Sequence, residues 1–178
     1  MHNIKVKDKI FSKFITAAEI DKAVCQVAVS MEKDLTGKNP LFLIVLNGAF
    51  MFASDLIKKL NFPCELSFIK LSSYSGLNTS NKVRELIGLN EDLTGRTVVV
   101  IEDIIDTGIT LGDLMETIKS KNAVEVKLAA LLFKPKAFRK SYPIDYIGLE
   151  IPNDFIVGYG LDYDGYGRNY PDIYKIVE

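Results

Sequence analysis

Three carboxylic acids stand within five residues of the chain, directly after its most apolar segment. Residues 98–110 read VVVIEDIIDTGIT, and the acids are Glu102, Asp103 and Asp106. An Asp-Thr-Gly-Ile-Thr turn at the start of a helix presents several backbone N–H groups, which together form a binding site for phosphate. The acids would repel a lone phosphate. They would accept a sugar phosphate, because carboxylates bind vicinal hydroxyls and hold Mg²⁺ directly or through water.

The segment therefore predicts a site for a ligand that carries both a phosphate and a sugar. Two structural alternatives stand beside this interpretation. Asp106 could serve only to cap the helix that follows, since aspartate is a favoured N-cap residue. Glu102 and Asp103 could be solvated charges at the end of a strand.

Such a site needs a strand that ends at it and a helix that starts there. The apolar residues 97–101 (TVVVI) predict a buried strand, and apolar residues at helical spacing over 111–118 predict the helix. Ligands of open α/β sheets bind at the carboxyl ends of strands, where these acids fall.

The rest of the chain alternates in the same way between strands and helices. Residues 16–19 (TAAE) predict a capping box for a helix whose apolar stripe ends at Leu35, and a second helix is predicted at 49–60. Further strands are predicted at 41–46, 65–71, 126–133, 146–151 and 155–159. This order predicts an α/β fold with a mainly parallel central sheet flanked by helices. Residues 72–81 predict a lid or binding loop, and the residues after Gly160 predict an irregular cap over one end of the sheet.

Length and composition limit the classes of function. The chain has 178 residues, with 22 Lys and Arg against 23 Asp and Glu, which fits a single domain, 1–178, without the basic excess of a nucleic-acid-binding protein. The longest apolar run, 41–46, is far shorter than the ~18 residues of a membrane span. Two cysteines and no apolar leader predict a cytoplasmic protein, and a single histidine, His2, excludes histidine triads and histidine metal sites.

Residues 98–110 resemble the phosphoribosyl pyrophosphate signature of the type I phosphoribosyltransferases. Four more segments, with Arg168 beyond them, are similar to the hypoxanthine (6-oxopurine) branch of that family: 46–50 (LNGAF), 72–74 (SSY), 132–135 (LFKP) and 151–163 (IPNDFIVGYGLDY). The resemblance implies the type I phosphoribosyltransferase fold, with a small hood built from the terminal segments. It implies a Mg²⁺-dependent enzyme of purine salvage that joins hypoxanthine, or guanine, to phosphoribosyl pyrophosphate. Its partners would be these small molecules, with no nucleic acid or membrane, and copies of the chain would form a homodimer or homotetramer.

The resemblance also assigns roles to residues. Phosphoribosyl pyrophosphate would bind Leu46, Asn47, Gly48, Ser73, Tyr74, Glu102, Asp103, Asp106, Thr107, Gly108, Ile109, Thr110 and Arg168. The purine would bind Lys134, Phe155, Ile156 and Asp162, and Mg²⁺ would bind Glu102, Asp103 and Asp162. Asp106 would be the general base at purine N7, and Lys134 would donate to the purine O6. The loop 46–48 often contains a non-proline cis peptide bond in this family.

Two other functions share parts of this pattern. Regulatory RNA-binding relatives carry the same signature but need a basic face for RNA phosphates. An adenine or pyrimidine transferase is the nearer alternative, although adenine needs an acceptor where Lys134 has only donors. The chain also departs from common family residues at Asn47, Ile109 and Asp154, and the sequence leaves open the preference among hypoxanthine, guanine and xanthine.

Overall fold

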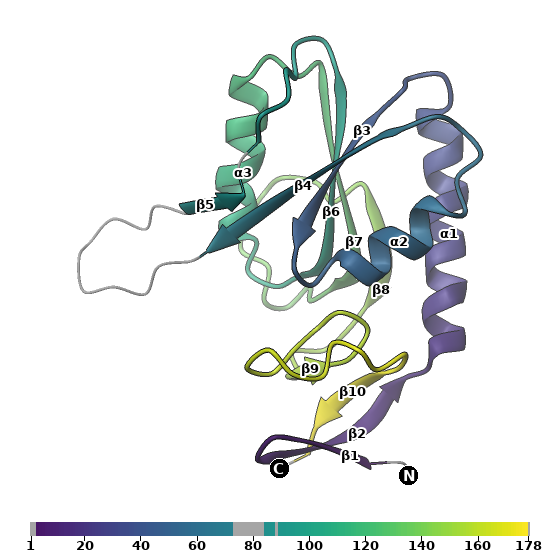
Figure 1. Ribbon diagram of the computed structural model, residues 1–178, viewed down its shortest axis with the longest axis vertical. Coiled ribbons are helices and arrows are strands. Elements are labelled where there is room, and N and C mark those ends of the chain that lie inside the picture. Colours follow the sequence, from purple (N-terminus) through teal and green to yellow (C-terminus); the bar gives the residue numbers. More distant parts are fainter. Residues whose placement is uncertain (1–2, 73–83, 88, 178) are drawn as a thin grey trace.

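The centre of the protein is a six-stranded sheet in which only one edge strand runs antiparallel to the rest. The computed structural model describes residues 3–72, 84–87 and 89–177, and the strand order is β5-β4-β3-β6-β7-β8 (Figure 1). The parallel strands are β3 (Leu41–Leu46), β4 (Glu65–Ser72), β6 (Thr97–Ile105), β7 (Glu125–Phe133) and β8 (Tyr146–Glu150), and the antiparallel one is β5 (Arg84–Ile87). The predicted mainly parallel sheet is confirmed.

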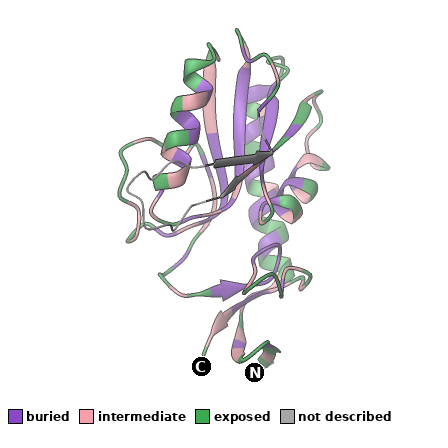
Figure 2. Ribbon diagram, turned by 60° about the vertical axis from the view of Figure 1, so that its left-hand side comes forward, coloured by how far each residue is buried: buried purple, intermediate pink, exposed green. Residues whose placement is uncertain are grey.

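Helices cover both faces of this sheet, which explains why its central strands are apolar on both sides. Helices α1 (Ala17–Leu35) and α2 (Phe50–Ile57) pack on one face, and α3 (Ile109–Ser120) packs on the other (Figure 1). The strands between them are buried along most of their length (Figure 2). Among the described residues, no helix has the length and apolarity needed to cross a membrane.

Helix α1 begins as the sequence predicts. The Thr16 side chain accepts from the Glu19 N–H at 3.3 Å, and the Glu19 carboxylate accepts from the Thr16 N–H at 2.8 Å. This capping box satisfies N–H groups that have no partner within the helix.

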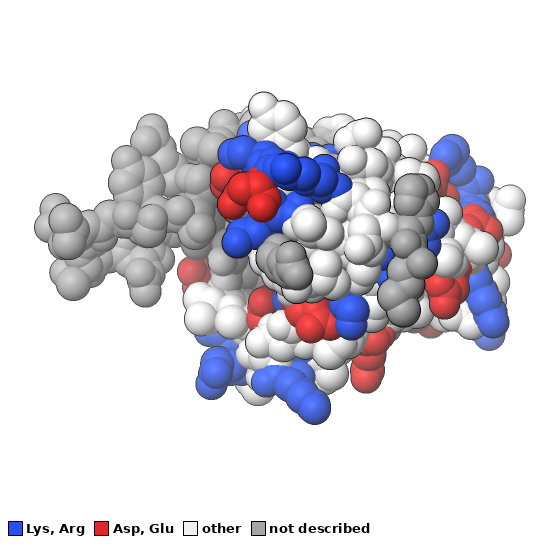
Figure 3. Space-filling view, turned by 90° about the horizontal axis from the view of Figure 1, so that it is seen from below, with Lys and Arg blue, Asp and Glu red and all other residues white. Residues whose placement is uncertain are grey.

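The two ends of the chain form a second, antiparallel sheet that we call the hood. Its strands are β1 (Asn3–Val6), β2 (Lys9–Ile15), β10 (Ile173–Ile176) and β9 (Ile156–Val157), in that order across the sheet. Both ends of the chain lie in it, below the central sheet in Figure 1. On the underside of the hood, basic and acidic side chains are interspersed (Figure 3).

The hood from terminal segments is confirmed, but its strands differ from the prediction. The tail after Gly160 is not wholly irregular, because it contains β10, and the strand predicted at 155–159 is limited to β9. Strand β10 pairs with β2, whose sequence lies at the other end of the chain, so no local pattern reveals the pairing.

Two side-chain contacts fasten the hood to the helices of the central sheet. Asp172 accepts from the N–H of Ala17 at 2.7 Å and forms an ion pair with Lys13 at 2.6 Å. The Tyr159 hydroxyl donates to Asp55 of α2 at 2.7 Å. These contacts hold the residues that follow Tyr159 at the end of the central sheet that faces the hood.

Candidate active site

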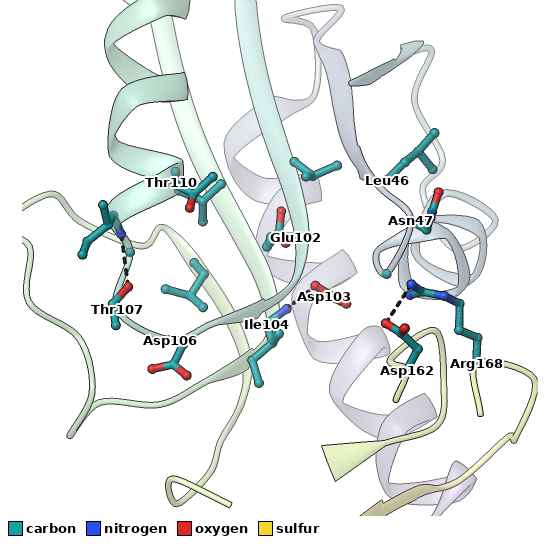
Figure 4. A pocket seen from close by; sticks show the side chains of 16 residues that line it. Leu46, Asn47, Glu102, Asp103, Ile104, Asp106, Thr107, Thr110, Asp162 and Arg168 are labelled. Atoms are coloured by element: carbon teal, nitrogen blue, oxygen red, sulfur yellow. Dashed lines mark hydrogen bonds and ion pairs between the residues drawn. The ribbon is translucent and has the colours of Figure 1, made fainter. Parts of the chain in front are cut away.

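A cleft of about 360 Å³ opens at the carboxyl ends of β3 and β6. These strands are parallel neighbours, so the residues that follow each of them meet at one edge of the sheet. The cleft brings together predicted residues from four segments (Figure 4): 46–48, 102–103, 106–110, and Asp162 with Arg168.

Glu102 and Asp103 lie near the end of β6, within the strand itself. Asp103 is 7% exposed, and its Oδ1 accepts from the N–H of Ile104 at 2.8 Å. Oε2 of Glu102 is buried and has no hydrogen-bond partner among the described residues. Burial raises the pKa of both carboxyls, and the neighbouring Asp103 charge raises that of Glu102 further. The pair therefore favours a ligand that brings hydroxyl donors or a cation.

Residues 106–110 turn from the end of β6 into α3. The N-cap of α3 is Gly108, which has φ 76° and ψ 4° and makes no side-chain capping bond. The alternative that Asp106 caps this helix is therefore wrong. Thr107 Oγ1 accepts from the N–H of Ile109 only at 3.5 Å, so the first turn retains weakly occupied N–H groups of the kind that bind anions.

The loop after β3 passes directly against Asp103. The peptide bond between Leu46 and Asn47 is cis, and the Asn47 side chain is exposed. A Cβ atom added to Gly48 would lie 1.6 Å from Oδ2 of Asp103, so only glycine fits here. On the other side, a Cβ atom on Gly160 of the hood would lie 2.1 Å from the Gly48 carbonyl oxygen.

Asp162 and Arg168 bring a fixed cation to the cleft from the hood. The guanidinium of Arg168 forms an ion pair with Asp162 at 2.7 Å (Figure 4). It also donates to the Gly160 carbonyl at 2.6 Å. Asp162 also accepts from the N–H of Gly165 at 2.6 Å. The positive charge of Arg168 lowers the pKa of Asp103, against the larger effect of burial.

The residues predicted to bind a purine lie outside the lining of this cleft, except for Asp162. Lys134 is 8% exposed, and its Nζ lies 3.5 Å from Oδ2 of Asp106, so it borders the cleft. Phe155 is 47% exposed and contacts Phe11 and Tyr163 of the hood region, and Ile156 is buried in β9.

Two further predictions concern the loop and the metal. Ser73 and Tyr74 lie outside the residues that the structure describes. Within the described residues, no three or more His, Cys, Asp or Glu side chains form a group that could hold a metal ion, so Glu102, Asp103 and Asp162 do not form one by themselves.

The segment behind the turn 106–110 was not predicted from the sequence. The Tyr142 hydroxyl donates to the Gly108 carbonyl at 2.6 Å, and the Phe138 ring packs against the same glycine. Neither residue belongs to a periodic pattern or to a recognised motif, so no signal in the chain pointed to them.

Comparisons with known proteins place the chain in a family. Residues 16–164 match the family described as phosphoribosyl transferase domain. The chain is 37% identical over 174 residues to a hypoxanthine-guanine phosphoribosyltransferase of Streptococcus pneumoniae, covering 97% of each. It is also 38% identical over 172 residues to the bifunctional protein TilS/HprT of Listeria innocua. That match covers 96% of this chain but only 26% of the length of the relative.

A solved structure gives the same result in three dimensions. The crystal structure of a hypoxanthine-guanine phosphoribosyltransferase from Bacillus anthracis, with a HEPES molecule in its active site, is similar with a TM-score of 0.88. The two are 34% identical, and the similarity covers 96% of this chain and 99% of the other.

Proposed function

The chain belongs to the phosphoribosyltransferase family, and we propose that it transfers the 5-phosphoribosyl group from phosphoribosyl pyrophosphate to hypoxanthine, and to guanine. Two of the relatives described above are named hypoxanthine-guanine phosphoribosyltransferases. In this reaction a purine nitrogen forms a bond to C1′ of the ribose, the C1′–O bond breaks, and pyrophosphate leaves. The observation that carries the proposal is the cleft itself. It joins a turn with weakly occupied N–H groups, the carboxylates of Glu102 and Asp103, and a fixed arginine at one end of the sheet.

Each part of phosphoribosyl pyrophosphate has a complementary group in this cleft. We assign the 5′-phosphate to the N–H groups of 106–110 and the ribose hydroxyls to Glu102 and Asp103. We assign the pyrophosphate to the loop 46–48 and to Arg168. The support is chemical: N–H groups at a helix start bind phosphate, and unpaired carboxylate oxygens accept from hydroxyls.

We assign the purine to the side of the cleft where Lys134 meets Asp106. The ammonium of Lys134 would donate to O6, and the carboxylate of Asp106 would take the proton from N7. Phe155 would stack on the base, and the main chain of Ile156 would bind its edge. The exposure of Phe155 and the 3.5 Å separation of Lys134 Nζ from Asp106 Oδ2 support these roles.

Mg²⁺ suits the donor set of the cleft. Glu102 has a buried oxygen without a partner among the described residues, and Asp103 lies next to it. Magnesium sites commonly use one or two carboxylates, with water and substrate phosphates completing the shell. We propose that Glu102 and Asp103 hold the ion and that Asp162 helps to place a second one. When bound, Mg²⁺ would neutralise charge on the leaving pyrophosphate.

We further propose that the enzyme works in the cytoplasm as a homodimer or homotetramer. Both Cys25 and Cys64 are free, which fits a reducing compartment. Leu66 and Phe68, two residues apart on the same face of β4, are 47% and 45% exposed, and exposed apolar groups favour contact with another copy. Sedimentation analysis of the purified protein tests the association.

Initial rates with phosphoribosyl pyrophosphate, Mg²⁺ and one base at a time test the function. Hypoxanthine, guanine, xanthine and adenine are compared, and we expect nucleotide formation with hypoxanthine or guanine and almost none with adenine. EDTA should abolish the reaction, and added Mg²⁺ should restore it. Preferential use of adenine would contradict the assignment of the base, and full activity in EDTA would contradict that of the metal.

A further inference from the structure

A short segment after β7 supports the phosphate-binding turn from behind. We call residues 134–142 the support segment. It donates three hydrogen bonds to carbonyl groups at and before the turn: Lys134 N–H to Ile105 at 2.9 Å, Arg139 N–H to Thr107 at 3.2 Å, and the Tyr142 hydroxyl to Gly108 at 2.6 Å. The third is the only one made by a side chain.

These bonds determine where the N–H groups of the turn point. In a trans peptide, the C=O of one residue and the N–H of the next point in opposite directions. Carbonyls held against the support segment therefore turn the N–H groups of Asp106, Gly108 and Ile109 to the opposite side. That side is the cleft, which all three residues line.

Aromatic packing fixes Tyr142 in place. Its ring meets that of Phe138 edge to face at 5.4 Å, and Phe138 meets Phe133 in the same way at 5.4 Å. A Cβ atom on Gly108 would lie 2.6 Å from Cε2 of Phe138 and 2.7 Å from the Tyr142 hydroxyl. The turn thus rests directly on these two rings.

The Tyr142 hydroxyl remains a donor at neutral pH. Burial, with a smaller contribution from the Glu102 charge, raises its pKa to about 12. The Gly108 carbonyl accepts this bond together with the helical bond from the N–H of Gly112 at 3.0 Å, one for each lone pair.

We propose that Tyr142 is a positioning residue for the phosphate of the sugar phosphate, acting through the Gly108 carbonyl to aim the N–H of Ile109 into the cleft. This inference rests on the proposed function, because it names the part of the substrate that the turn binds. The other two hydrogen bonds to the turn come from backbone N–H groups, so Tyr142 is the position at which a side-chain change removes one of the three bonds.

The test compares Tyr142→Phe with wild type and with Tyr146→Phe. The first variant keeps the ring and its packing on Phe138 but removes the hydroxyl. The control removes a tyrosine hydroxyl bonded to Asp34 at 3.1 Å, at the amino end of the sheet and away from the cleft. Two quantities are measured: KM for each substrate, and Kd for ribose 5-phosphate by titration calorimetry.

For Tyr142→Phe we expect KM for phosphoribosyl pyrophosphate and Kd for ribose 5-phosphate to rise by roughly three- to tenfold, the effect of one lost neutral hydrogen bond. KM for hypoxanthine should change by less than about twofold, and Tyr146→Phe should leave all three values near wild type. A general loss of structure would instead raise both KM values together, and that result would overturn the inference.

The outcomes separate this inference from the proposed function. Binding of ribose 5-phosphate needs no turnover, so a wild-type protein that binds it but forms no nucleotide would contradict the function alone. Equal Kd values for wild type and Tyr142→Phe would contradict the role of Tyr142, as would a wild type that does not bind ribose 5-phosphate. Thermal melts of both variants establish that they are folded.

Discussion

Replacing Gly48 by alanine should strongly reduce the proposed transferase activity. The backbone at Gly48 does not have the positive φ that would exclude alanine, so the obstacle is contact alone. The new Cβ atom would lie 1.6 Å from Oδ2 and 2.5 Å from Cγ of Asp103, where ordinary contact begins at 3.4 Å. The carboxylate or the loop must then shift by roughly 2 Å to restore van der Waals contact.

Neither the Asp103 carboxylate nor the loop 46–48 can move away without disturbing the site. Movement of Asp103 breaks its 2.8 Å hydrogen bond from Ile104, and movement of the loop is blocked by Gly160, whose backbone passes close to the Gly48 carbonyl. Because misplacement of a reacting group by 1 Å can cost about a hundredfold in rate, we expect kcat/KM for phosphoribosyl pyrophosphate to fall by at least ~10²-fold.

Gly37→Ala is the matched control, since it makes the opposite kind of change. Gly37 has φ +83° and no atom within 4 Å of an added Cβ, so alanine there strains the backbone without touching the site. This variant should lose ~1–2 kcal/mol of stability and keep its activity. Steady-state kinetics and thermal melts on both variants give the result. A Gly48→Ala variant that retained kcat/KM within threefold of wild type would show that the close contact with Asp103 does not limit activity.

Three more substitutions test other parts of the site and of the hood. Asp106→Asn should reduce turnover by ~10²–10⁴-fold because it removes the proposed general base, and it should leave helix capping unaffected because the N-cap of α3 is Gly108. Turnover within a few-fold of wild type would show that another group takes the proton. Lys134→Met should lower kcat/KM for hypoxanthine far more than for adenine, and an unchanged ratio of the two would place specificity in the main chain near Phe155. Asp172→Asn should lower the free energy of unfolding at pH 7, because it loses the ion pair with Lys13. The pKa of Asp172 is lowered in the folded protein, first by Lys13, so this stabilisation is present above the carboxyl's ordinary pKa and is lost as acid takes the pH down through the folded value. Melts of both proteins between pH 7 and pH 3 should therefore converge, and a constant difference would contradict the assignment.

The sequence was sufficient to predict those features of the structure that depend on neighbouring residues. The strand Leu41–Leu46 and the capping box at Thr16 both follow from local patterns, and both are confirmed. The meeting of the loop 46–48 with Glu102 and Asp103 follows from parallel pairing of two apolar strands.

Features that depend on partners far apart in the chain could not be predicted from the sequence. The pairing of β2 with β10 joins the two ends of the chain. In β2, Phe11 and Ile15 are buried and Lys13 is exposed, a pattern that does not identify the partner strand. The position of Tyr142 against Gly108 depends on an irregular segment whose path no periodicity describes. The alternative that Asp106 caps α3 is wrong for a different reason. Gly108 is the N-cap and adopts a left-handed conformation, which leaves no capping role for Asp106.

The passage of Gly160 over Gly48 limits how this protein can be recombined with its relatives. A chimera that imports a hood to alter base preference would carry its own residue at position 160, and any side chain there would begin 2.1 Å from the Gly48 carbonyl oxygen. The hood and the loop after β3 therefore form one exchangeable unit, although more than a hundred residues separate them along the chain. Crossovers that divide this unit would combine a loop and a hood from different parents. A library built by single crossovers between residues 48 and 160 would therefore contain few active variants unless both parents have glycine at the two positions.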